Sequence, residues 1–243
     1  THLALKATAD FLRDKSAYLE REVALRTLEV QAIQDVTIMA MTSLAETRDN
    51  ETGNHIRRIQ LYVKALAERL RNHPRFEAVL NERMIELLYK SAPLHDIGKI
   101  GIPDSILLKP GKLTVEEFEV MKTHTTLGRK AIEDAERRLG MRVAFLSVSK
   151  EIAYSHQEKW DGSGYPQGLA GDQIPVSARL MAVADVYDAL INKRVYKAAF
   201  SHDQACSTIV KGKGTHFDPD MVDAFVDIAE DFRSIALKYP DPE

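Results

Sequence analysis

The sequence predicts an all-α protein in which a long N-terminal helix precedes one helical domain. Apolar residues recur three, four and seven positions apart through most of the chain, which is the spacing of helix faces. The alternating pattern typical of strands is almost absent. With 243 residues, 44% of them hydrophobic, the chain can bury a sizeable core. We therefore predict a helical linker or dimerisation helix over residues 1–42 and one domain over residues 43–243.

The predicted N-terminal helix carries an imperfect heptad seam. Two series of residues seven positions apart form it: Leu19, Arg26, Ile33 and Ala40, and Val23, Val30, Thr37 and Leu44. One interpretation is a parallel coiled coil that joins two copies of the chain. The other is a long amphipathic helix folded onto its own domain. Arg26 and Thr37 on the seam keep both interpretations open.

The first helices of the domain follow a polar break at residues 46–49. Apolar residues at helical spacing predict a helix from Ile56 to Leu70, closed by an Asn-His-Pro sequence at residues 72–74. A second helix is predicted through Met84 toward His95.

The rest of the domain is predicted to be helical apart from one long loop. Thr114 followed by Glu117 resembles a capping box at a helix start. Helices are predicted over residues 116–139, 143–156, 177–191, 202–210 and 219–237. A Gly- and Pro-rich loop at residues 161–171 separates the second of these helices from the third.

Composition limits the classes of partner. The formal charge of −3 and pI near 6.3 provide no basic field for a nucleic-acid polymer. Cys206 is the single cysteine, so no intrachain disulfide can form. No apolar run approaches the roughly 20 residues that cross a bilayer. We expect a soluble cytoplasmic protein without a membrane partner, whose natural polypeptide extends upstream of Thr1.

Seven residues of metal-ligand type are scattered over more than half of the chain. They are Glu51, His55, His95, Asp96, His124, His156 and Asp185. Imidazoles and carboxylates mixed in one pocket are what a hydrolytic site for two or more divalent metals requires. His95 and Asp96 are adjacent inside an otherwise apolar segment, and polar groups are costly to bury unless something pairs with them. Any one of these histidines alone is better explained as a structural or surface group.

Six short motifs together resemble one known family. They are ETGNH at 51–55, HDIGK at 95–99, KPGKL at 109–113, DGSGYP at 161–166, ADVYDAL at 184–190 and GTHFDP at 214–219. His95-Asp96, with His55 upstream and Asp185 downstream, is similar to the HD phosphohydrolase superfamily. The Gly164-Tyr165-Pro166 loop makes residues 43–243 resemble the HD-GYP subfamily. A chance match to all six motifs is implausible.

The resemblance implies metal-dependent hydrolysis of cyclic di-GMP, a bacterial second messenger, to pGpG and then to GMP. All seven residues of metal-ligand type would be ligands, and two divalent ions per chain, iron or manganese, would be the cofactors. Asp96 would bridge the ions as a catalytic residue. Lys99 would neutralise charge in the reaction and contact substrate.

The resemblance also implies a set of phosphate-binding residues. Arg194 and Lys197 would hold the phosphates of the ligand, although a solvated helix end explains the same two residues without it. Asp188 lies one helical turn after Asp185 and is grouped with the substrate-binding residues. It is also suited to orienting a metal-ligand side chain or a lysine without touching the metal itself.

One position departs from the family pattern. Where the family shows two consecutive histidines, this chain has His156 followed by Gln157, and an amide is a poor replacement for an imidazole at a metal. We therefore expect two metals instead of three. A reduced rate, or a reaction that stops at the linear dinucleotide pGpG, is the hypothesis that follows.

The Gly164-Tyr165-Pro166 loop has two interpretations. It is either a structural turn beside the site or a docking surface for partners such as diguanylate cyclase domains, and the structural role comes first. Trp160 lies just ahead of the loop. We interpret it first as a core anchor and second as a stacking platform for a guanine base. The long N-terminal helix resembles linkers that carry a signal from an upstream receiver domain and join two copies of the chain.

Two alternatives to a cyclic di-GMP hydrolase remain open. The first is a receptor that binds cyclic di-GMP or a cyclase domain and hydrolyses little or nothing, which an absence of metal-dependent turnover would select. The second is another HD hydrolase, acting on guanosine tetraphosphate or on cyclic GMP-AMP. The Gly-Tyr-Pro loop and the pair Arg194 and Lys197 disfavour guanosine tetraphosphate but not cyclic GMP-AMP.

Overall fold

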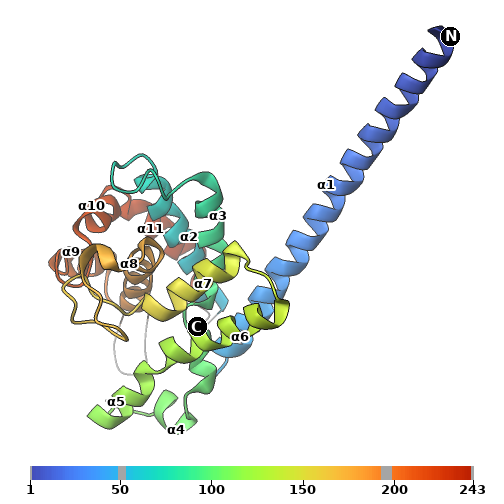
Figure 1. The fold of residues 1–243 in the computed structure, drawn as a ribbon. Helices are drawn as coiled ribbons and strands as arrows, with labels where there is room; N and C mark the ends of the chain where they lie inside the picture. Colours follow the sequence, from blue (N-terminus) through green and yellow to red (C-terminus); the bar gives the residue numbers. More distant parts are fainter. Residues whose placement is uncertain (1, 49–52, 193–198, 242–243) are drawn as a thin grey trace. The chain divides into compact units, whose positions relative to one another are not determined.

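The computed structural model describes residues 2–48, 53–192 and 199–241, and these residues are mainly helical (Figure 1). The elements are α1 (His2–Glu46), α2 (Gly53–Leu70), α3 (Glu82–Ser91), η1 (Ala92–Leu94), η2 (Ile97–Gly101), α4 (Asp104–Leu107), α5 (Val115–Lys122), α6 (His124–Leu139), α7 (Ala144–Ser155), η3 (Gly171–Gln173), α8 (Val176–Ile191), α9 (His202–Lys211), α10 (Pro219–Asp227) and α11 (Ala229–Lys238). Within the described ranges there are two isolated bridges and no strand. The predicted all-α class is confirmed.

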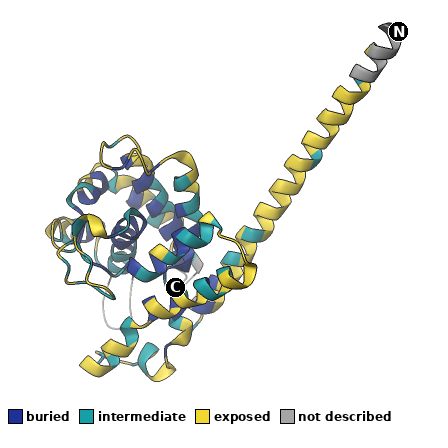
Figure 2. Ribbon diagram, in the orientation of Figure 1, coloured by how far each residue is buried: buried dark blue, intermediate teal, exposed yellow. Residues whose placement is uncertain are grey.

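The chain divides into two compact units, residues 1–40 and residues 41–243, so that α1 contributes to both. Taken alone, the described part of the first unit is one helix whose apolar side chains are mostly exposed. Its seam residues Val23 (65% exposed), Val30 (63%) and Ile33 (60%) are open to solvent (Figure 2). No helix in the described parts of the chain is both long and apolar enough to pass through a bilayer.

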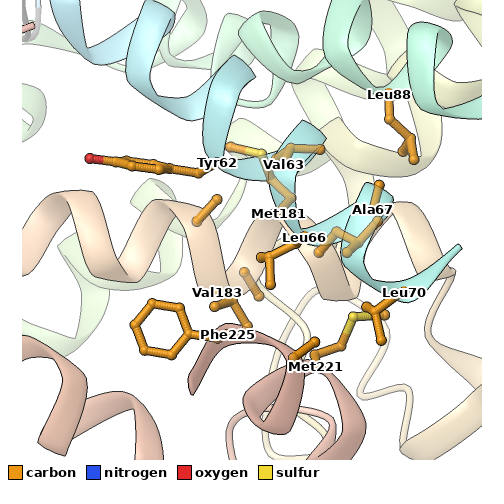
Figure 3. Packing of buried hydrophobic residues seen from close by; sticks show 14 of the residues in the cluster. Tyr62, Val63, Leu66, Ala67, Leu70, Leu88, Met181, Val183, Met221 and Phe225 are labelled. Atoms are coloured by element: carbon orange, nitrogen blue, oxygen red, sulfur yellow. The ribbon is translucent and has the colours of Figure 1, made fainter. Parts of the chain in front are cut away.

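The core of the second unit is built on α2. Side chains of α2, α8 and α10 fill it (Figure 3), and α3, α9 and α11 close it. The rings of Tyr62 and Phe232 stack at 4.3 Å between centroids. Fully burying an aromatic or aliphatic side chain of this size contributes about 1.5–3 kcal/mol. The core therefore fixes α2 and α8, the helices that carry His55 and Asp185, against each other.

The predicted capping box is confirmed. Thr114 Oγ1 accepts a hydrogen bond from the backbone N–H of Glu117 at 3.2 Å, and Glu117 Oε2 accepts one from the N–H of Thr114 at 2.7 Å. Both groups would otherwise lack partners at the start of α5.

Two of the predicted helices are each divided into two. The helix expected over 116–139 is broken at Thr123, whose hydroxyl donates to Val120 O at 2.6 Å and so competes for a carbonyl of the last turn. The helix expected over 219–237 is broken at Ile228, which leaves helical geometry with φ −119°. The first break makes His124 the first residue of α6.

Candidate metal centre

Six of the seven predicted ligands converge in two groups of three. One group is His55, His95 and Asp185, and the other is Asp96, His124 and His156. Within each group the candidate ligand atoms lie within 4.8 Å of one another. All four histidines are buried. Five separate segments of the chain supply the six side chains, so only the packed fold brings them together.

Asp96 lies between the two groups. Its Oδ2 is 3.3 Å from His95 Nε2 in the first group. Its Oδ1 is 3.3 Å from both His124 Nε2 and His156 Nε2 in the second. The carboxylate thus presents one oxygen to each group, which is the arrangement by which a carboxylate bridges two metals.

Three of the histidines are oriented by carbonyl oxygens at helix ends. The Nδ1 atoms of His95, His124 and His156 lie 3.0, 2.8 and 3.0 Å from the carbonyl oxygens of Ala92, Met121 and Ile152. Carbonyls in the last turn of a helix have spare hydrogen-bonding capacity. A carbonyl oxygen can only accept, so each Nδ1 carries the hydrogen and each Nε2 keeps its lone pair for the centre.

His55 is oriented by Asp188 instead. Its Nδ1 lies 2.8 Å from Asp188 Oδ2, and Arg58 Nε donates to Asp188 Oδ1 at 2.6 Å. Burial by itself would raise the pKa of Asp188, but the hydrogen bonds from Arg58 and His55 outweigh burial and lower it. The anionic carboxylate therefore holds His55 in the tautomer whose Nε2 is free of hydrogen.

The electrostatics favour anionic Asp96. Burial would raise its pKa, yet Lys99, with Nζ 2.7 Å from Oδ2, and His95 together lower the pKa well below its ordinary value. Burial lowers the pKa of His124 to about 4, so this ring is neutral at physiological pH. For His95 burial also acts downward, but the charges of Asp96 and Asp185 raise the pKa overall.

The donor set fits divalent metal ions. His124 Nε2 and His156 Nε2 are 3.4 Å apart, and since both carry lone pairs they repel each other unless a cation lies between them. Among the described residues, the buried atoms His95 Nε2 and Asp96 Oδ1 have no hydrogen-bond partner. Buried acceptors without donors are costly, and coordination to a metal would satisfy both.

Close backbone contact between η2 and α6 brings Asp96 to His124. A Cβ atom added to Gly98 would lie 1.9 Å from His124 O and 2.5 Å from Gly128 N. No side chain fits in that space, so glycine at position 98 allows the turn after Asp96 to pack directly on the first turn of α6.

The Gly164-Tyr165-Pro166 loop packs beside the centre. Glu158, a buried carboxylate, accepts hydrogen bonds from the N–H groups of Gln167 at 2.8 Å and Leu169 at 3.0 Å. The Tyr165 ring lies edge-on to His124, with centroids 6.2 Å apart, and its peptide bond to Pro166 is cis. A Cβ on Gly164 would lie 2.3 Å from Lys159 N. These contacts favour the structural interpretation of the loop.

Trp160 packs against two arginines. The guanidinium carbons of Arg75 and Arg179 each lie 5.6 Å from its ring centroid, and both arginines pair with the buried Asp218. This packing favours the core-anchor interpretation over a platform for a base.

The structure describes some of the other predicted site residues and not others. Glu51, Arg194 and Lys197 lie outside the described residues. Asp188 is 2% exposed and contacts His55, so its position supports the orienting role and not the direct contact with substrate. Lys99 lies against Asp96. Gln157 is half-buried, and its carbonyl accepts from Tyr165 N at 3.2 Å.

Two residues of the site were missed from the sequence. Arg58 is three positions after His55, on the same face of α2, and this spacing was the available signal. Glu158 gave no local signal, because its partners are backbone N–H groups of a loop nine and eleven residues later.

Comparisons with known proteins show what the chain is similar to. The HD domain family matches residues 40–221. A Vibrio cholerae protein named "Probable cyclic di-GMP phosphodiesterase" is 54% identical over 243 residues, covering 100% of this chain and 55% of that protein. The "3'3'-cGAMP-specific phosphodiesterase 2" of Vibrio cholerae is 40% identical over 201 residues, covering 83% of this chain and 36% of that protein.

The fold also matches a solved structure. A cyclic GMP-AMP specific phosphodiesterase of V. cholerae superposes with a TM-score of 0.52 at 19% identity, covering 82% of this chain and 50% of that one. At this identity the likeness concerns the fold alone. This chain spans about half the length of the Vibrio cholerae relative that is 54% identical to it.

Proposed function

Because the chain belongs to the HD domain family, we propose that it is a metal-dependent phosphodiesterase that hydrolyses cyclic di-GMP. The name of the relative that is 54% identical along the whole chain supports this substrate. The proposed product is the linear dinucleotide pGpG, and Gln157 would make further hydrolysis of pGpG to GMP slow or incomplete. The reaction needs a nucleophile derived from water and neutralisation of charge on a phosphodiester, and a centre of imidazoles and carboxylates suits both needs.

The position of Asp96 carries the proposal. With one oxygen toward His95 and the other toward His124 and His156, it would bridge two divalent ions, iron or manganese. His55, His95 and Asp185 would complete one ion's ligands, and His124 and His156 the other's. Glu51 is proposed as a further ligand. When bound, the ions would lower the pKa of water and neutralise charge on the phosphate.

Cationic side chains would complete the site. Lys99 is proposed to contact a phosphate oxygen from its position beside Asp96, where its charge would offset the charge that develops in the transition state. Arg194 and Lys197 are proposed to hold the substrate phosphates, since a guanidinium makes a forked contact and an ammonium a point contact.

The decisive experiment is anaerobic purification, followed by metal analysis and a cyclic di-GMP hydrolysis assay in which pGpG and GMP are separated. We expect two metals per chain and turnover that a chelator removes and Mn²⁺ or Fe²⁺ restores. Metal-loaded protein that binds cyclic di-GMP or a cyclase domain without turnover would contradict the enzyme and favour the receptor.

A second candidate substrate is cyclic GMP-AMP, because the 40% identical relative is named for it. It differs from cyclic di-GMP in one base, so the metal centre alone would not distinguish the two. Competition between equal concentrations of both dinucleotides in one assay discriminates these candidates. Faster consumption of cyclic GMP-AMP would make it the preferred substrate and would contradict the proposal of cyclic di-GMP.

Gln157→His is expected to raise turnover or to move the product from pGpG toward GMP. An imidazole beside His156 would add a ligand of the kind that metals prefer, whereas the amide of Gln157 is a weak one. Metal analysis and product separation on the variant and the parent protein would measure this effect. Equal turnover and equal products would contradict a role for position 157.

We also propose that residues 1–42 join two copies of the chain in a parallel coiled coil, through which an upstream receiver domain would act. The exposed seam residues Val23, Val30 and Ile33 support this pairing. Sedimentation analysis should find a dimer, which Val30→Glu converts to monomer. Leu25→Glu, an equally exposed position outside the seam, should leave the dimer intact. A dimer that survives Val30→Glu would assign the contact to another surface.

A further inference from the structure

We propose that the C-terminal segment at residues 239–241 is a positioning part of the metal centre and acts through Arg58 and Asp188 on His55. This inference rests on the proposed metal site. None of the residues involved, apart from His55, would touch a metal or substrate, so their role is to hold the His55 ring in its orientation.

Arg58 connects the segment to Asp188. Its Nε and one terminal nitrogen donate to the two oxygens of Asp188 at 2.6 and 2.9 Å, which is a forked contact. The other terminal nitrogen donates to Tyr239 O at 2.7 Å and to Asp241 Oδ1 at 2.8 Å. The Arg58 side chain is 1% exposed, so these partners replace its water.

These contacts restrict the rotation of the Arg58, Asp188 and His55 side chains. A buried guanidinium needs partners for its donors, and Asp188 supplies only one edge. The C-terminal segment supplies the partners of the terminal nitrogen that Asp188 does not reach. Because guanidinium and carboxylate are both planar, fixing one edge of Arg58 also fixes the plane of Asp188, and Asp188 Oδ2 holds His55 Nδ1 at 2.8 Å.

Two further residues near the start of α2 contact the segment. Asn54 Nδ2 donates to Pro240 O, and the Arg57 guanidinium carbon lies 5.9 Å from the Tyr239 ring centroid. The residues next to His55 in α2 therefore recognise three consecutive residues from the other end of the domain.

The expected effect is on metal affinity first. Partners behind a metal-ligating histidine typically change metal affinity about 10- to 100-fold when they are removed. Asp241 is three contacts from His55, through Arg58 and Asp188. Asp241→Ala should therefore weaken binding by about 10-fold, and Arg58→Lys, which keeps the charge but loses the fork, should weaken it more.

The test compares Co²⁺ affinity, by competition with a chelator, and the Co²⁺ absorption spectrum of the full chain with those of its variants. We expect weaker binding and an altered spectrum for Asp241→Ala and Arg58→Lys. Asp227→Ala is the matched control, because Asp227 also pairs with an arginine of α2, Arg69, away from Asp188. It should leave affinity and spectrum unchanged. Melting temperatures of all variants would show whether each remains folded.

A double variant tests the route through Arg58. If Asp241 acts through Arg58, Asp241→Ala should weaken binding less in the Arg58→Lys background than in the parent protein. Wild-type affinity and spectrum for Asp241→Ala would overturn the inference, as would an equal loss in Asp227→Ala. If Arg58→Lys does not fold, the comparison of Asp241→Ala with Asp227→Ala still decides whether the C-terminal segment affects the metal centre.

The same measurements separate the inference from the proposed function. A parent protein that binds no divalent metal would contradict both. A parent protein that binds metal but hydrolyses no cyclic dinucleotide would contradict the proposed activity only, and the affinity comparison would still decide the role of the C-terminal segment.

Discussion

Asp96→Ala is expected to lower cyclic di-GMP turnover by at least about 10³-fold and to reduce the metal content below that of the parent protein. Asp96 is the side chain whose two oxygens face the two groups of candidate ligands. Without it, both ions would lose a ligand and the negative charge that helps to hold them. Metal analysis and product separation on anaerobic protein measure both effects.

The matched control for Asp96→Ala is Asp203→Ala, which removes an exposed carboxylate in the first turn of α9. It should keep the metal content and turnover of the parent protein. If the Asp96 variant retained turnover within tenfold of the parent protein, a bridging role for Asp96 would be wrong and the catalytic centre would lie elsewhere.

Gly98→Ala is expected to lower the free energy of unfolding by about 3 kcal/mol and to inactivate the enzyme. The added Cβ would lie 1.9 Å from His124 O, a backbone atom that moves only if α6 moves. Such a shift would carry His124 away from Asp96 and open the second group of ligands. Chemical denaturation measures the stability, and Co²⁺ binding measures the integrity of the centre.

Gly101→Ala is the control within the same short helix. Its added Cβ would lie 2.8 Å from Leu127 Cδ1, the end of a side chain that can rotate away. We expect a smaller loss of stability, within about 1 kcal/mol, and intact metal binding. If Gly98→Ala were as stable and active as Gly101→Ala, close packing of η2 on α6 would not be what positions His124.

The helices that the sequence predicted correctly are those whose signals are local. The start of α5 was predicted because Thr114 and Glu117 are three residues apart and exchange hydrogen bonds across one turn. The breaks at Thr123 and Ile228 were missed. Threonine and isoleucine both occur inside helices, and nothing in the adjacent sequence requires the chain to change direction there.

The candidate site shows the same division. Residue type and motif selected His95, Asp96 and the other ligand-type residues, because few side chains can bind a metal. Which Asp96 oxygen faces which histidine could not be predicted, since that depends on how η1, α6 and α7 pack. Gly98 appeared in the sequence only as a residue that lets the backbone turn, and its close contact with α6 became evident in the fold.

The sequence by itself determined the all-α class, the positions of most helices and the identity of the candidate ligands, because these depend on neighbours three or four residues apart or on side-chain chemistry. Only the tertiary structure decided that Asp96 lies between two groups and that Arg58 joins Asp188 to Asp241. Residues 58, 188 and 241 are far apart along the chain, and burial of the shared core is what brings them within hydrogen-bonding distance.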